Sequence, residues 1–217
     1  MREIFILCGS PRKTGCSAAI VRFLEGKLSQ AGNIAVSNAF LTCGQQADVI
    51  QKITDADVLV LVLPVYENSV PGSVMRLFEC LCEQKNQLVT RKRQLLAVTS
   101  SGFCALPANS CTLSTCRLFA QEAGFEWLGG ISAVPGPLVD EKALTAEKGL
   151  CKRLARALTA AANSLARQIP IPPEAFRLLG RPLIAPAIYR LGAYFFHKKS
   201  EKSLGKTVYY ARPLADS

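Results

Sequence analysis

The sequence predicts an α/β fold: a doubly wound, five-stranded parallel sheet covered by helices and followed by a C-terminal helical extension. Three observations predict it. Strand-like and helix-like segments alternate five times, as parallel crossover connections require. Residues 57–63, DVLVLVL, are apolar on both faces after the first residue, which is typical of a strand at the centre of a parallel sheet. Small polar residues follow three of the predicted strands, at the edge where such sheets bind ligands.

The expected strands are short apolar runs bounded by polar or turn-forming residues. In chain order they lie at residues 3–8, 34–41, 57–63, 94–99 and 125–134. The paired glycines Gly129 and Gly130 predict a bend in the last of them, because glycine inside a strand often marks a bulge.

The expected helices carry apolar residues at intervals of three and four, which places those residues on one face. In chain order they lie at residues 16–31, 45–54, 72–84, 108–123 and 143–168. The first has Ile20, Leu24 and Leu28 on one stripe. The last is expected to be a single long helix, because leucines repeat along one face at positions 150, 154, 158 and 165.

The composition changes after residue 168, so we expect a domain at residues 1–168 and an extension at residues 169–217. Prolines at 170, 172 and 173 open the extension. Residues 1–150 contain 14 Lys and Arg and 13 Asp and Glu, whereas residues 151–217 contain 12 and 3, so the net charge of +10 belongs mainly to the C-terminal third. A lid over the ligand site, a dimer contact, a membrane-surface segment and a solvated extension are the alternatives for this basic, aromatic segment. We expect no nucleic acid, because no reader element accompanies the charge.

Nothing in the sequence resembles a signal peptide or a membrane span of roughly 18–20 apolar residues, so we expect a cytoplasmic protein. The nine cysteines include no C-x-x-C pair. We interpret most of them as small buried side chains in a reducing compartment, and we expect no metal site.

The loop after the first strand has the composition of a phosphate site. It reads GSPRKTGCS, residues 9–17, and it ends where the first helix begins. A helix N-terminus offers free backbone N–H groups and the positive end of a dipole. Ser10, Thr14 and Ser17 add hydroxyl groups, and Arg12 can bind phosphate oxygens in a bidentate manner. The loop matches neither the nucleoside-triphosphate pattern nor the dinucleotide fingerprint, and an ordinary capped turn is the alternative.

The loops after the third and fourth strands suit a flat ring. PVYENSVPG, residues 64–72, offers Tyr66 as an aromatic surface and backbone groups for the edge of a heteroaromatic ligand. TSSG, residues 99–102, is a third small polar loop that the predicted fold places at the same edge. Together the three loops predict a phosphate site beside a ring site.

With these stretches in view, the chain resembles the flavodoxin-like NAD(P)H-dependent FMN reductases and the related multimeric flavoproteins over about residues 1–165. The resemblance implies the strand order 2-1-3-4-5, FMN as cofactor and NADPH or NADH as electron donor. It implies cofactor-binding roles for residues of all three loops: Ser10, Arg12, Thr14, Gly15, Cys16, Ser17, Pro64, Val65, Tyr66, Glu67, Ser100, Ser101 and Gly102.

Two positions depart from the pattern of these families. Cys16 stands where relatives often have Asn, and Cys43 stands alone where the iron–sulfur branch has a cysteine cluster, so no such cluster is expected. The implied activity is electron transfer from NAD(P)H to a quinone, flavin, azo or nitro compound, or to a partner protein, by a homodimer or tetramer. Because a flavin supplies this chemistry itself, we expect no catalytic side chain. An electron carrier without its own substrate, and a binding module that lacks FMN, are the alternatives.

Overall fold

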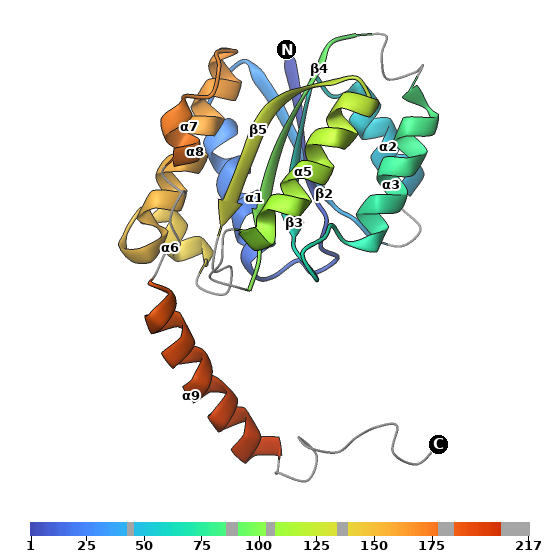
Figure 1. Ribbon diagram of the computed structural model, residues 1–217. Coiled ribbons are helices and arrows are strands. Elements are labelled where there is room, and N and C mark those ends of the chain that lie inside the picture. Colours follow the sequence, from blue (N-terminus) through green and yellow to red (C-terminus); the bar gives the residue numbers. More distant parts are fainter. Residues whose placement is uncertain (43–45, 86–90, 103–106, 134–138, 178–184, 205–217) are drawn as a thin grey trace, which may run out of the picture. The chain divides into compact units, whose positions relative to one another are not determined.

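The computed structural model describes residues 1–42, 46–85, 91–102, 107–133, 139–177 and 185–204 (Figure 1). Its centre is a five-stranded parallel sheet in the order β2-β1-β3-β4-β5, which confirms the predicted fold class and strand order. The strands are β1 (Arg2–Cys8), β2 (Ile34–Phe40), β3 (Val58–Pro64), β4 (Arg93–Ser100) and β5 (Phe125–Ala133).

Helices cover both faces of the sheet, as Figure 1 shows. The hydrophobic cluster on one face includes residues of α1 (Cys16–Leu28), α6 (Glu141–Thr145), α7 (Lys152–Arg167) and α8 (Pro173–Arg177). The cluster on the other face includes residues of α2 (Gln46–Asp55), α3 (Gly72–Glu83) and α5 (Pro107–Glu122).

The central strand β3 explains why the sheet has two apolar faces. All seven of its residues are buried. Val58, Val60 and Val62 contribute to one cluster, and the three leucines between and after them contribute to the other, because successive side chains of a strand point to opposite faces. This two-sided burial is what the apolar run in the sequence predicted.

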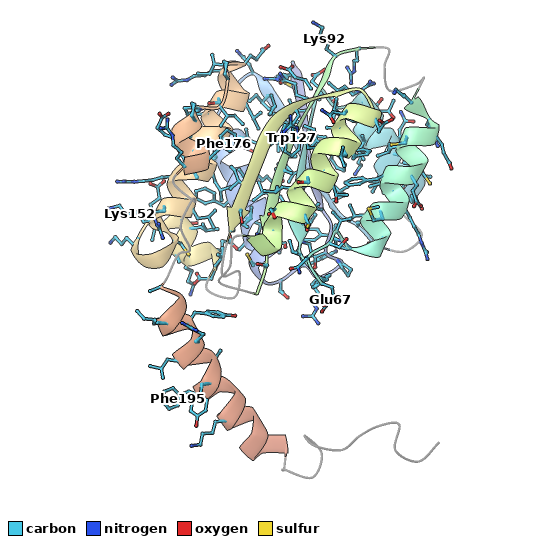
Figure 2. The ribbon with its side chains drawn as sticks, viewed as in Figure 1. Glu67, Lys92, Trp127, Lys152, Phe176 and Phe195 are labelled. Atoms are coloured by element: carbon cyan, nitrogen blue, oxygen red, sulfur yellow. The ribbon has the colours of Figure 1, made fainter. Side chains whose placement is uncertain are left out.

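The predicted bend in β5 is a β-bulge. Leu95 of β4 pairs with Trp127, and the next residue of β4 pairs with Gly129, so Leu128 is the extra residue. Gly129 has a φ of 132°, which a residue with a side chain rarely adopts. The ring of Phe176, from α8, occupies the space where a Cβ atom at Gly129 would lie. In Figure 2, Phe176 is drawn beside β5.

The single long helix predicted at residues 143–168 is wrong. The structure has α6, a 3₁₀ turn at Gly149–Cys151 and then α7. Asp140 begins α6, where its carboxylate accepts a hydrogen bond from the Ala143 N–H at 2.9 Å. Glu147 and Gly149 then have positive φ values of 50° and 59°, and these left-handed residues interrupt the helical path.

Contacts between residues group Met1–Leu183 into one compact unit and Ile184–Ser217 into a second. The first unit therefore includes α8, which belongs to the segment that composition separates from the domain. The described part of the second unit is α9 (Pro186–Leu204). None of the described helices combines the length and the apolar character needed to cross a membrane.

Candidate functional site

The three polar loops meet at the carboxyl edge of the sheet. Backbone hydrogen bonds join them there: Gly9 N–H donates to Val62 O at 2.9 Å, and Val65 N–H donates to Ser100 O at 2.8 Å. Figure 2 shows Glu67 at this edge and Lys92 at the opposite one. A cleft of about 290 Å³ opens between the loops. Its lining residues are Ser10, Arg12, Thr14, Gly15, Cys16, Ser17, Pro64, Val65, Tyr66, Ser100, Ser101 and Gly102.

These lining residues are all predicted site residues. The thirteenth predicted residue, Glu67, does not line the cleft. The geometry thus brings together residues that are up to 92 positions apart in the chain, from Ser10 to Gly102. Their contacts with a cofactor remain a prediction.

Because Gly9 has no side chain, the first loop can pass close to the core directly after β1. A Cβ atom at this position would lie 2.5 Å from Leu63 Cδ2 and 2.8 Å from Val74 Cγ2. Leu63 and Val74 are themselves fully buried, so they have little room to move. The glycine therefore sets the path by which the loop turns toward the cleft.

The start of α1 supplies free N–H groups to the cleft. The first helical hydrogen bond runs from Ala19 N–H to Gly15 O at 3.0 Å, which leaves the N–H groups of residues 16–18 without a helical acceptor. No side chain caps this end, and the first turn contains no acidic residue. The positive end of the helix dipole is therefore uncompensated beside Ser10, Thr14 and Ser17.

Arg12 adds a full positive charge to this end of the cleft. Its backbone N–H donates to Ser10 Oγ at 3.3 Å, which anchors the loop. Its guanidinium group has no hydrogen-bond or ion-pair partner among the described residues. Helix N–H groups, hydroxyl groups and an unpaired guanidinium form a donor set that fits a phosphate.

The second loop is a tight turn that displays Tyr66. Tyr66 and Ser69 exchange backbone hydrogen bonds of 3.2 and 2.9 Å, and Glu67 and Asn68 between them have φ values of 49° and 59°. Positive φ at both central residues is the signature of a type I′ turn. The Tyr66 side chain is 57% exposed while it lines the cleft, so one of its surfaces is available to a ligand ring.

The turn also explains why Glu67 is not in the cleft. Glu67 is a central residue of this turn, is exposed and does not line the cleft. In such a turn the N–H groups of the two central residues take no part in the hydrogen bonds that close it. Those of Glu67 and Asn68 are therefore available to the edge of a ligand.

Ser100 connects the third loop to the first. Its Oγ lies 3.4 Å from Ser17 Oγ, and it also forms a hydrogen bond with the Cys16 thiol. Burial is the larger influence on that thiol and raises the pKa of Cys16 to about 11, although the bond to Ser100 acts in the opposite direction. The thiol therefore stays neutral near pH 7 and adds no negative charge beside a bound phosphate.

One residue that supports the site was not predicted from the sequence. Asn109, at the start of α5, is fully buried, and its Nδ2 donates to Ser132 Oγ at 2.7 Å and to Thr99 O at 3.5 Å. It thereby joins the ends of β4 and β5 next to Ser100. Its Oδ1 and the hydroxyl of Thr112, three residues later, are buried and have no hydrogen-bond partner among the described residues. An asparagine and a threonine three positions apart on a buried helix face were the available signal.

We expect Asn109→Ala to destabilise the protein by about 1 kcal/mol, because Ser132 and the Thr99 carbonyl lose a buried donor. Urea unfolding would measure this. Thr115→Ala is the matched control, since Thr115 is a half-buried threonine of the same helix whose hydroxyl donates to Cys111 O within that helix. Equal stability losses in the two variants would contradict a role for Asn109 in joining the strand ends.

A larger hollow, of about 850 Å³, lies at the opposite edge of the sheet, where the strands begin. Three of its polar side chains are paired in a chain of hydrogen bonds. The Arg2 guanidinium donates to Leu165 O and Gln94 Oε1, and the Gln94 amide donates to Glu126 Oε2 at 2.9 Å.

Among the described residues, no cluster of three or more His, Cys, Asp or Glu side chains could hold a metal ion. Cys43, on which the expectation about an iron–sulfur cluster rests, lies outside the described residues.

The family of the chain is shown by a match to a family model. A family model described as NADPH-dependent FMN reductase matches residues 2–112, just over half of the chain. That match includes all three loops of the cleft. No curated protein sequence matches the chain.

Several solved structures share the fold of this chain at low sequence identity. A WrbA-like flavodoxin from Agrobacterium tumefaciens is 12% identical, with a TM-score of 0.57 over 77% of this chain and 99% of that chain. The Trp repressor binding protein of Bacillus subtilis is 14% identical, with a TM-score of 0.55 over 74% and 98%. An NADH:FMN oxidoreductase in its apo form is 12% identical, with a TM-score of 0.58 over 81% and 94%. These likenesses show that the fold is flavodoxin-like.

Proposed function

This chain belongs to the NADPH-dependent FMN reductase family, an oxidoreductase family that uses FMN and NAD(P)H, and we propose that its three-loop cleft is the FMN site. In this proposal the phosphate binds at the start of α1, to the free helical N–H groups, the hydroxyl groups and Arg12. The ring lies between Tyr66 and the loop at Ser100–Gly102. The observation that carries the proposal is that one cleft is lined both by an uncapped helix N-terminus and by Arg12, whose guanidinium has no partner among the described residues.

The protein groups serve mainly to bind and orient. When bound, FMN supplies the redox chemistry: it takes electrons from a reduced nicotinamide and passes them to an acceptor. Tyr66 provides a surface that fixes the plane of the ring. The N–H groups of Glu67 and Asn68 can donate to its edge, where hydrogen bonds stabilise negative charge.

Within the described lining of the cleft, neither Arg12 nor Cys16 is suited to act as a general base near neutral pH. Its titratable lining residues are Arg12, Cys16 and Tyr66. An arginine stays protonated and a thiol with a pKa of about 11 does not ionise in that range. We therefore keep the prediction that electron transfer at this site needs no catalytic side chain.

The acceptor is proposed to be a small molecule such as a quinone, a flavin, or an azo or nitro compound. The lining of the cleft comes from loops at the carboxyl edge of the sheet, where a bound ring would be accessible to successive small partners. The expected homodimer or tetramer remains a prediction, which light scattering on the purified protein would check.

The proposed function is tested with the purified full-length protein. We expect a yellow protein with flavin absorbance bands, which NADPH or NADH bleaches under anaerobic conditions and which a quinone then restores. The same protein without nicotinamide is the control. A protein that retains FMN but is reduced by neither nicotinamide would be an electron carrier instead, and a colourless protein that FMN cannot reconstitute would contradict the site.

A further inference from the structure

The surface of α9 carries a stripe of apolar side chains. Ile188, Leu191, Tyr194 and Phe195 are 65%, 58%, 59% and 59% exposed. They fall at spacings of three, six and seven residues from the first, so they share one side of the helix. We refer to these four residues as the α9 stripe.

Cations accompany the α9 stripe. Tyr194 and Phe195 make an edge-to-face pair with ring centroids 5.7 Å apart, and Lys198 Nζ lies 5.8 Å from the Tyr194 ring centroid. Lys198 thus continues the stripe toward the C-terminus, where Lys199 and Lys202 follow in the sequence. An apolar and aromatic surface that ends in lysines suits a boundary between an apolar phase and anionic groups.

Charge distinguishes between the candidate partners of this helix. Residues 184–217 contain 6 Lys and Arg and 2 Asp and Glu, a net charge of +4. Residues 1–183 contain 20 and 14, a net charge of +6. A second copy of the chain, or the α/β unit of the same chain, therefore carries a net charge of the same sign. A bilayer that contains anionic lipids offers both an apolar interior and opposite charge.

We propose that α9 binds the surface of an anionic lipid membrane, with the α9 stripe inserted at the boundary between headgroups and acyl chains. Lys198 and its basic neighbours contact lipid phosphates. The helix lies on the membrane and does not cross it, in agreement with its length and polarity. Association of this kind would bring the reductase to acceptors that are dissolved in lipid.

The test is co-sedimentation of the full-length protein with vesicles of phosphatidylcholine alone and with vesicles that contain about 30 mol% phosphatidylglycerol. We expect binding to the anionic vesicles only. Ile188→Ser combined with Leu191→Ser should abolish it, and Lys198→Gln should weaken it about fivefold, the effect of removing one cation near such a surface.

Two matched variants control for general changes in the surface. Leu118→Ser removes an equally exposed leucine, 61% exposed, from α5, and Lys152→Gln removes an exposed lysine from the start of α7. Both should bind anionic vesicles like the unmodified protein. Flavin absorbance and reduction by NADPH, recorded for every variant without vesicles, show that the protein is folded.

Four outcomes would overturn the proposal. Absence of binding would contradict membrane association. Equal binding to neutral and anionic vesicles would contradict recognition of anionic lipid. A change from oligomer to monomer in the double serine variant, together with no vesicle binding by the unmodified chain, would make the α9 stripe a contact between copies. Loss of FMN from that variant in solution would make α9 a cover for the cleft.

Discussion

Replacing Arg12 with alanine is expected to raise the dissociation constant for FMN about 30-fold. The guanidinium of Arg12 has no partner among the described residues and lies beside the free N–H groups of α1, so a bound phosphate would be its first acceptor. Hydrogen bonds to charged groups contribute about 2 kcal/mol, which corresponds to that factor. Fluorescence titration of the cofactor-free protein with FMN would measure the change.

The same titration with riboflavin, which lacks the phosphate, separates charge recognition from damage to the ring site. Arg12→Ala should leave the affinity for riboflavin unchanged. Lys13→Ala is the matched control, because Lys13 is the neighbouring exposed cation and does not line the cleft. An equal loss of FMN affinity in both variants would mean that diffuse positive charge, and not Arg12, attracts the phosphate.

Replacing Gly9 with alanine is expected to lower the free energy of unfolding by about 2 kcal/mol, the middle of the range for overpacking a filled core. The added methyl group would overlap Leu63 and Val74, which are buried on the α2, α3 and α5 side of the sheet. Relief requires the loop to move away from the core, so the affinity for FMN should fall as well. Urea unfolding without FMN gives the stability change directly.

Gly26→Ala is the matched control, since it adds the same methyl group to an exposed position of α1 with no atom within 4 Å. It should stabilise the protein by about 0.5–1 kcal/mol, because alanine favours a helix over glycine. The two substitutions are thus expected to have effects of opposite sign. Stabilisation by both would show that the close contact at Gly9 is not maintained in solution.

Local patterns predicted the fold well where each element is determined by its own residues. The two-sided apolar run of β3 could only be a central strand, and the glycine pair at Gly129 correctly indicated a bulge. The break between α6 and α7 escaped prediction because the leucine spacing continues across it. Two residues could have indicated the correct boundaries. Asp140 is a helix cap and marks the start of α6, and Gly149 adopts a left-handed conformation between α6 and α7.

The site was predictable to the extent that loop composition places donors at strand ends. Ser10, Arg12 and Tyr66 reach the cleft because parallel strands end at the same edge of the sheet. The exclusion of Glu67 depends on backbone angles of a turn that the sequence does not specify. Asn109 was missed because α5 was interpreted through its apolar stripe, whereas the contribution of Asn109 is a hydrogen bond between two strand ends.

The packing of Phe176 against Gly129 has a consequence for solubility. β5 pairs only with β4 in the sheet, so its outer side could recruit a strand from another molecule and begin aggregation. The bulge at Leu128 disturbs the regular spacing that such recruitment needs, and the Phe176 ring packs against Gly129 of the bulge. An edge strand with a bulge that α8 packs against is less suited to pairing with a strand of another molecule, and this effect is independent of the redox chemistry.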